Sequence, residues 1–294
     1  MYSAISANKR NTVLIMAAFV GLVAAVGWLI SQMFYGGNMS ITIAVMIGAL
    51  VYALIQYFAA GKLAVAATGA KEIKKADNPR LYRIVENLSI TLGMPMPKVY
   101  VMDDPAPNAF ATGRDPEHAI VAATTGLMDI MTDAELEGVM AHEMGHVKNY
   151  DIRVSMIAFG VVAAIAVLAD FARNMMFFGS GNRDNSPHPA VLIIGVVAII
   201  LAPVIATMIQ MAVSRQREYL ADASGALTTR HPEALASALE KIGQYGKPMK
   251  KQSTATAHMF FSNPLSKTSL SAMFSTHPPV EKRVERLRDN AEKF

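Results

Sequence analysis

The chain has 294 residues, of which 52% are hydrophobic and only 17% are charged, with a formal net charge of +4 and no cysteine. So large a hydrophobic fraction is unusual for a water-soluble globular protein and indicates that part of the chain lies in lipid. The lack of cysteine excludes disulfides and thiolate metal ligands, and the small positive charge gives no indication of nucleic-acid binding.

Two long apolar stretches come first, at residues 13–34 and 41–60. Each is about as long as the ~20 residues that cross a bilayer, and the link between them is short and uncharged. The pair therefore predicts a transmembrane hairpin over residues 1–60. Because the first stretch is long enough to span and leads directly into the second, it predicts an anchor and not a cleaved signal peptide.

A second transmembrane hairpin is expected over residues 154–213. Its first helix, at about residues 154–178, spans only if it continues through Asp170 and Arg173, which are spaced to pair near the lipid interface. Its second helix, at residues 190–213, is long and almost uninterrupted, and the alternative to a span is a buried core helix. The sequence thus predicts four transmembrane helices in contact with the lipid bilayer.

Lysine and arginine residues set the expected orientation, because they are enriched on the cytoplasmic side of membranes. Lys9 and Arg10 precede the first span, and the link between the first two spans has neither residue type. Many more follow the second span, whereas the link between the third and fourth spans has only Arg173 and Arg183. We expect both termini and all the polar sequence to be cytoplasmic.

The polar residues 61–153 predict a small unit of helices and strands. Residues 78–92 have apolar side chains at helical spacing, which predicts an amphipathic helix. Thr132 and Glu135 have the Thr-x-x-Glu form of a capping box, so a second helix is expected to start there and to continue as far as Asn149. Between these helices, short strands are expected at residues 99–102, 108–112 and 119–123.

The residues after the second hairpin, 214–294, predict a further helical part. Residues 246–271 are rich in Lys, Ser, Thr and Pro and predict a long surface loop. Helices are expected at residues 215–227, 232–242 and 279–293. The whole pattern is that of a mainly α membrane protein with a cytoplasmic α+β domain, a small β-sheet within it, and a membrane hairpin between its two halves.

A short motif, His-Glu-Met-Gly-His at residues 142–146, lies inside the helix that is expected to start at Thr132. Residues four apart share one helical face, so His142 and His146 can bind one metal ion. Glu143 can then reach the water on that ion without binding the ion itself. The alternative is a chance match, against which the helical placement counts. The motif predicts a zinc metallopeptidase with one Zn²⁺ per chain and Glu143 as its catalytic base.

A catalytic zinc needs a third protein ligand and an open position for water. Glu218 is the strongest candidate, because the second hairpin would leave the cytoplasmic face after His146 and return to it just before residue 215. Asp222, one turn later, can accept a hydrogen bond from a ligating imidazole and fix its tautomer. The alternative for Glu218 is an ordinary acid on a helix surface beside Arg215.

The chain resembles the HtpX family of bacterial membrane proteases, relatives of the eukaryotic CAAX prenyl endopeptidases. The resemblance rests on stretches that occur in the family's order: residues 107–113, 142–146, 217–222, and 274–279 with Arg283. It implies a gluzincin-type domain at the cytoplasmic face of a bacterial inner membrane. It also implies cleavage of unfolded or misassembled membrane proteins as quality control under stress, in overlap with an ATP-dependent membrane protease.

The resemblance also implies roles for residues outside the motif. His277 and Arg283 resemble the pair that stabilises the oxyanion or gates the metal; their alternatives are a helix cap and a surface cation. One stretch resembles the strand edge that pairs with an extended substrate through backbone hydrogen bonds. This edge consists of Asn108, Ala109, Phe110, Ala111 and Thr112.

Two other functions stay open from the sequence. A site-specific processing peptidase of the CAAX type would share the metal site, although such enzymes resemble longer chains with more spans. A membrane scaffold or transporter would need no such site, and the predicted spans contain almost none of the ionisable residues that mark transport pathways. Metal content, together with loss of proteolysis on Glu143→Gln, discriminates among the three.

Overall fold

The computed structural model describes residues 2–34, 37–157, 215–245, 248–251, 259–262 and 278–293. The second expected hairpin lies outside the described residues except at its start, where residues 151–157 are helical. His277 also lies outside them.

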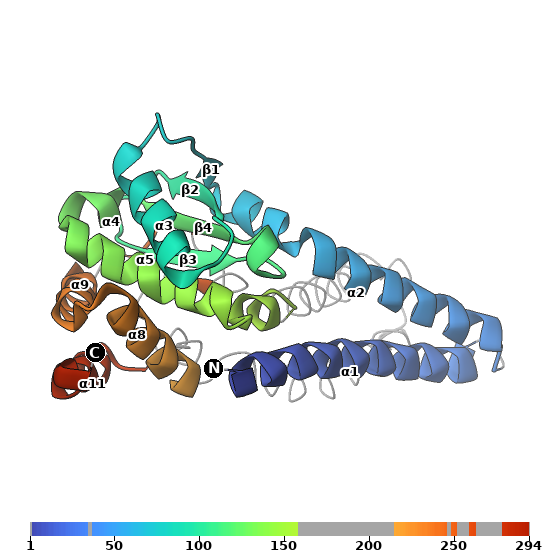
Figure 1. Ribbon diagram of the computed structural model, residues 1–294. Helices are drawn as coiled ribbons and strands as arrows, with labels where there is room; N and C mark the ends of the chain where they lie inside the picture. The colour runs from blue at the N-terminus through green and yellow to red at the C-terminus, as the bar shows by residue number, and fades with distance from the viewer. Residues whose placement is uncertain are drawn as a thin grey trace, which may run out of the picture.

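Two long helices form an antiparallel hairpin that projects from the rest of the molecule (Figure 1). They are α1 (Tyr2–Phe34) and α2 (Met39–Thr68). The side chain of Asn38 caps the start of α2, and Gly69 ends it in the left-handed conformation, with φ of 73°. The predicted helical hairpin is therefore present, and both helices continue into polar sequence beyond the apolar stretches.

Within the described residues, one helix is long and apolar enough to cross a membrane, at Thr42–Ala59. Only 17% of this window is buried inside the structure, which distinguishes it from the core helix of a globular domain. Exposed apolar surface of this extent requires a partner, and lipid fits a helix of this length. The other three spans remain predictions from the sequence.

A four-stranded mixed sheet has the strand order β1-β2-β4-β3. β2 and β4 are parallel, and the two outer strands run antiparallel to their neighbours. The three expected strands are present, each shifted by no more than one residue, whereas the two-residue β1 was not predicted. The strands are β1 (Lys71–Glu72), β2 (Lys98–Met102), β3 (Ala109–Thr112) and β4 (Ile120–Thr124).

Helices surround this sheet (Figure 1). Every helix expected from the described sequence is present, and the short α4 is an addition. Single 3₁₀ turns occur at Pro116–His118 and Ala291–Lys293. The α-helices are α3 (Pro79–Leu92), α4 (Thr125–Ile130), α5 (Asp133–Lys148), α8 (Arg215–Thr229), α9 (Pro232–Tyr245) and α11 (Val280–Asp289).

The main core lies between one face of the sheet and the helices. Val99 and Val121 of the sheet belong to it, together with Leu81 and Leu88 of α3. α5 lies at its centre, in contact with α3, α8, α9 and β3. This position buries most of α5, polar side chains included.

The opposite face of the sheet packs against parts of the chain that are distant in sequence. Phe110 and Met102 on this face lie in one buried cluster with Ala64 of α2 and with Met249 and Phe260. The prediction of a surface loop over residues 246–271 is therefore wrong at residues 259–262. The apolar side chains there fill the space beside β3 instead of facing water.

Candidate active site

The helix that carries the metal-ligand motif starts where the sequence predicts. The Thr132 side chain accepts a hydrogen bond from the Glu135 amide, and the Glu135 carboxylate accepts one from the Thr132 amide at 2.8 Å, so the capping box is formed. With the start of α5 fixed in this way, His142 and His146 lie one turn apart on the face that contacts α8.

The structure brings the three predicted ligands together. The Nε2 atoms of His142 and His146 lie 3.1 Å apart. Glu218 of α8 places one carboxylate oxygen 3.8 Å from the His142 Nε2 and the other 3.5 Å from the His146 Nε2. Gly225 permits this approach of α8 to α5, because a Cβ at that position would lie 3.1 Å from the His142 amide nitrogen.

This donor set fits a single small cation. Tetrahedral zinc with bonds of ~2.0–2.1 Å to nitrogen places its donors about 3.3–3.4 Å apart, close to the separations seen here. The Nδ1 atom of each histidine contacts a carboxylate, so the proton of each neutral ring belongs on Nδ1 and the Nε2 lone pairs face Glu218. Two imidazoles and a carboxylate without a thiolate suit Zn²⁺.

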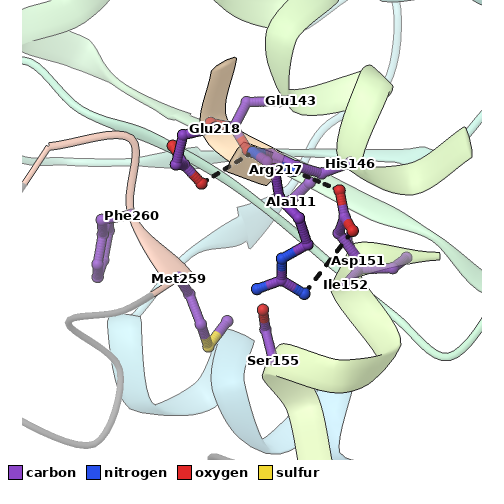
Figure 2. A pocket seen from close by; sticks show the side chains of 10 residues that line it. All are labelled: Ala111, Glu143, His146, Asp151, Ile152, Ser155, Arg217, Glu218, Met259 and Phe260. Carbon is purple, nitrogen blue, oxygen red and sulfur yellow. Dashed lines mark hydrogen bonds and ion pairs between the residues drawn. The ribbon is translucent and has the colours of Figure 1, made fainter. Parts of the chain in front are cut away.

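A pocket opens beside these ligands (Figure 2). Glu143, His146 and Glu218 line it, with Ala111 of β3 at its wall. The predicted base therefore lies in the same pocket as two of the predicted ligands. Arg217 also lines the pocket, and its Nη1 atom lies 3.7 Å from a carboxylate oxygen of Asp151.

Asp222 contacts His142, as the sequence predicts. One of its oxygens lies 2.9 Å from the His142 Nδ1. Arg283 of α11, only 1% exposed, donates to both oxygens of Asp222, at 2.6 Å and 2.9 Å. Burial alone would raise the pKa of Asp222, but Arg283 and the hydrogen bond to His142 lower it to about 2. Asp222 is thus a fixed negative charge behind His142.

Asp151 is a site residue that the sequence analysis missed. Its Oδ2 atom lies 2.9 Å from the His146 Nδ1, so it does for His146 what Asp222 does for His142. Tyr150, just after α5, adopts a positive φ of 62°, and Asp151 directly follows this turn. The sequence does contain a signal, which is an acid five residues after His146. The helix end was predicted at Asn149, and no role was predicted for Asp151.

The pKa values of the two histidines are shifted in opposite directions. Burial lowers the pKa of His142 to about 4, although Asp222 acts against it. Burial acts to lower the pKa of His146 as well, but Asp151, Glu218 and Glu143 together raise it to about 9. A cation that binds both Nε2 atoms needs both rings neutral, so metal binding competes with protonation of His146.

The predicted substrate edge is partly covered by the chain itself. Phe260 forms an antiparallel bridge with Phe110, and the Phe261 amide donates to the Ala109 carbonyl at 2.8 Å. The Asn108 side chain holds Ser262 by two hydrogen bonds, one to its amide and one to its carbonyl. The outer side of β3 thus pairs with a distant part of the chain, and its pairing with a substrate stays a prediction.

The same segment reaches the metal ligands. The ring of Phe261 meets that of His142 edge-on at 5.0 Å, and the Arg283 guanidinium lies over the Phe261 ring at 4.8 Å. Arg283 is therefore buried behind His142, in contact with Asp222 and Phe261. The surface-cation alternative for Arg283 does not hold.

Two histidines one turn apart, a glutamate of a second helix that could bind a metal ion with them, and a further glutamate in the adjoining pocket are the arrangement expected of a metallopeptidase. The comparison with known families agrees, since residues 75–291 match the model of peptidase family M48. The chain belongs to this family.

Its relatives include proteins named Protease HtpX homolog. The chain is 52% identical to the one from Tropheryma whipplei (strain Twist), over 100% of both chains. It is 46% identical to the one from Limosilactobacillus fermentum, over 98% of this chain and 99% of the relative. The resemblance drawn from the motifs is thus confirmed.

A solved structure also shares the fold. The crystal structure of S. mikatae Ste24p is similar with a TM-score of 0.54 over 98% of this chain and 67% of that one. The sequences are only 19% identical, so this likeness concerns the fold alone.

Proposed function

We propose that the chain is a zinc-dependent endopeptidase that hydrolyses unfolded or misassembled membrane proteins at the cytoplasmic face of the inner membrane. The convergence of His142, His146 and Glu218 beside Glu143 is the observation that carries the chemistry. The apolar helix at Thr42–Ala59 and the names of the relatives support action at a membrane. The quality-control role and the overlap with an ATP-dependent protease are the parts of the proposal that rest on the family resemblance.

In the mechanism that we propose, His142, His146 and Glu218 hold one Zn²⁺. The ion supplies a lowered pKa for a water, toward ~7, and polarises the carbonyl of the scissile bond. Glu143 accepts the proton of the attacking water and passes it to the leaving amine. His277 is expected to meet the developing oxyanion.

The carboxylates behind the histidines keep the ligands in place. Asp222 accepts a hydrogen bond from the Nδ1–H group of His142, and Asp151 accepts one from that of His146, which leaves both Nε2 atoms free to bind the ion. The two hydrogen bonds from Arg283 support a role in holding Asp222. The action of Arg283 on the oxyanion is expected from the family resemblance.

The substrate, in this proposal, adds as an extended segment along the outer side of β3. Such pairing uses backbone hydrogen bonds and therefore accepts many sequences, as removal of misassembled proteins requires. The end of the strand at Ala111 lines the pocket beside Glu143, which supports this as the place where the scissile bond lies. The antiparallel bridge between Phe260 and Phe110 supports this use of the strand.

The membrane arrangement that we propose has four spans. The hairpins at residues 1–60 and 154–213 alternate with the two halves of the peptidase domain, at residues 61–153 and 214–294. Both termini and the active site would be cytoplasmic. The lysine and arginine distribution supports this orientation.

Glu143→Gln is the experiment that tests the proposed function. The detergent-solubilised variant should lose all cleavage of an unfolded protein such as β-casein, yet bind zinc at close to one equivalent per chain, because Glu143 acts on water and not on the ion. Peptide release and metal content by mass spectrometry are the measurements. A variant that cleaves casein like the parent would refute the proposed base, and one that loses its metal would show that Glu143 is a ligand.

A further inference from the structure

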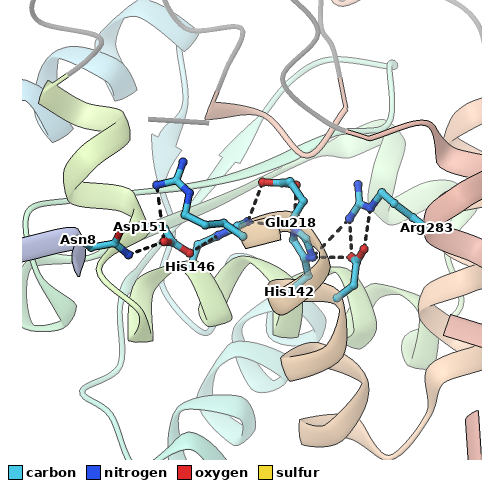
Figure 3. Close-up of polar contacts among 8 residues, drawn as sticks. Asn8, His142, His146, Asp151, Glu218 and Arg283 are labelled. Atoms are coloured by element: carbon cyan, nitrogen blue, oxygen red, sulfur yellow. Dashed lines mark hydrogen bonds and ion pairs between the residues drawn. The ribbon is translucent and has the colours of Figure 1, made fainter. Parts of the chain in front are cut away.

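The first helix reaches the active site through one side chain. Asn8 lies near the start of α1, and it is only 5% exposed. Its side-chain amide donates one hydrogen bond to Oδ1 of Asp151 at 2.7 Å and another to the Asn149 carbonyl at 2.9 Å. A continuous line of contacts therefore joins Asn8, Asp151, His146 and Glu218 (Figure 3).

The two oxygens of Asp151 have different partners. Oδ2 contacts the His146 Nδ1, and Oδ1 accepts the hydrogen bond from Asn8. A carboxylate held at one oxygen alone can still rotate about its side-chain torsion, whereas bonds at both oxygens fix its plane. Arg217 also forms an ion pair with Oδ1, but its Nη1 atom is 3.7 Å away, beyond hydrogen-bond distance. Asn8 is thus the group that fixes the Oδ1 side of Asp151.

Asn8 belongs to a face of α1 that packs against the chain just after α5. Asn8, Thr12, Ile15 and Phe19 recur at helical spacing, and all four are buried. Ile15 and Phe19 share a cluster with Val154 and Ile157, and Lys9 lies over the Tyr150 ring at 4.6 Å. The contact between Asn8 and Asp151 is therefore held by a packed interface between α1 and the segment after α5.

We propose that Asn8 is a positioning residue of the metal site, through which the docking of the first transmembrane helix sets the orientation of His146. The inference rests on the proposed function, because His146 must bind the ion for its orientation to matter. It makes the N-terminal hairpin a part of the peptidase site as well as a membrane anchor. Loss of the Asn8 amide should weaken zinc binding without touching any ligand.

Asn8→Ala and Asn8→Asp test this in the full-length protein. Asp has the size of Asn but no donor, and it places a second carboxylate against Asp151. Both variants should bind zinc about 10 to 100-fold more weakly in a competition with a chromogenic chelator, the range for groups that orient a metal ligand. At saturating zinc, kcat should fall while KM for casein changes little, because the hydrogen bonds of Asn8 go to Asp151 and Asn149 and not to the substrate edge.

Thr12→Val is the matched control. Thr12 lies one turn further along the same buried face, and its hydroxyl has no hydrogen-bond partner among the described residues. Val preserves its shape, so helix docking is retained and zinc affinity should equal that of the parent. If Thr12→Val and Asn8→Ala lose affinity equally, Asn8 acts only through helix packing and the inference fails.

The exchange variant Asn8→Asp/Asp151→Asn separates positioning from folding. The new amide at position 151 would donate to the new carboxylate at position 8, while the amide oxygen accepts from the His146 Nδ1. Zinc affinity should therefore exceed that of Asn8→Asp alone. Parent-like zinc affinity in Asn8→Ala, or no recovery in the exchange variant, would overturn the inference. If instead the parent binds no zinc, or His146→Ala binds it normally, the proposed function itself is at fault.

Discussion

The two histidines of the metal site lie on one helix but are held by carboxylates of different origin. Asp222 behind His142 receives two hydrogen bonds from the buried Arg283. Asp151 behind His146 receives one from Asn8 and an ion pair at 3.7 Å from Arg217. His142 thus has the more rigid support. His146 depends on contacts with α1.

Arg283→Met tests the support that Arg283 and Asp222 give to His142. The substitution leaves Asp222 buried without its cation, and breaking a buried pair in this way costs about 3–5 kcal/mol of the free energy of unfolding. We expect a large fall in the thermal midpoint in detergent. The double variant Asp222→Asn/Arg283→Met should lose less stability than Arg283→Met alone, and equal losses would mean that the Asp222 charge is not the cause.

At this scale the sequence could predict the residues of a local motif but not all of their supports. His142, Glu143 and His146 follow from helical spacing alone, and Asp222 from its place one turn after Glu218. Asp151 could not be found in this way, because it lies beyond α5, after the turn at Tyr150. Nor could Arg283 be placed behind Asp222, since the two are distant in sequence and meet only through packing.

Among the elements, those with local end signals agree best with the sequence predictions. α3 starts after Asn78, whose side chain caps it, and ends at Gly93, and α5 starts at its capping box. β1 and residues 259–262 were missed because their pairing partners are distant in the chain. A two-residue strand, and a short apolar run inside a polar region, carry too little local pattern to show that they pair.

Glu135 connects α5 to α9 through hydrogen bonds. This contact gives a prediction about stability at acid pH. Glu135 accepts hydrogen bonds from Ser237 and Lys241, each at 2.6 Å. Burial acts to raise the pKa of Glu135, but Lys241, Ser237 and Thr132 lower it to about 2, against 4.5 for the ordinary residue. Because the folded-state pKa is the lower one, Glu135 stabilises the fold above pH 4.5, and this stabilisation is lost as the pH falls toward 2.

Glu135→Gln should therefore cost up to about 3 kcal/mol of the free energy of unfolding at pH 7. The difference from the parent should shrink to about half at pH 3, as the carboxylate of the unfolded parent becomes protonated. Thermal unfolding in detergent at both pH values measures it. An equal difference at both pH values would show that lost packing is responsible and not the charge.

On the scale of the whole molecule, the α1–α2 hairpin and the peptidase domain are in contact at several places. Ala64 of α2 packs on the sheet, the Arg114 guanidinium lies over the Phe58 ring of α2, and the start of α1 packs on residues after α5. The expected boundary at residue 60 divides the sequence by composition, but packing crosses it. Composition and length are the basis of the predicted spans, whereas contacts between a helix of the hairpin and the domain depend on side chains that meet only in the fold.

Reporter fusions test the proposed topology. Fusions after residue 150 and at Phe294 should report a cytoplasmic location, and one in the link at residue 37 a periplasmic one, because lysine and arginine are concentrated on one side. Alkaline phosphatase and green fluorescent protein provide opposite readouts at each site. A periplasmic signal at Phe294 would mean an odd number of spans, and residues 154–178 would then be the segment that does not cross.

The separation of the metal ligands along the chain has a consequence for synthesis. Glu218 follows His146 by 72 residues, although the two side chains lie 3.5 Å apart in the folded protein. A nascent chain that has left the ribosome as far as α5 offers only two of the three ligands, and Arg217 and Asp222 are still missing. The growing polypeptide therefore lacks one of its three proposed metal ligands until α8 has been synthesised and docks on α5.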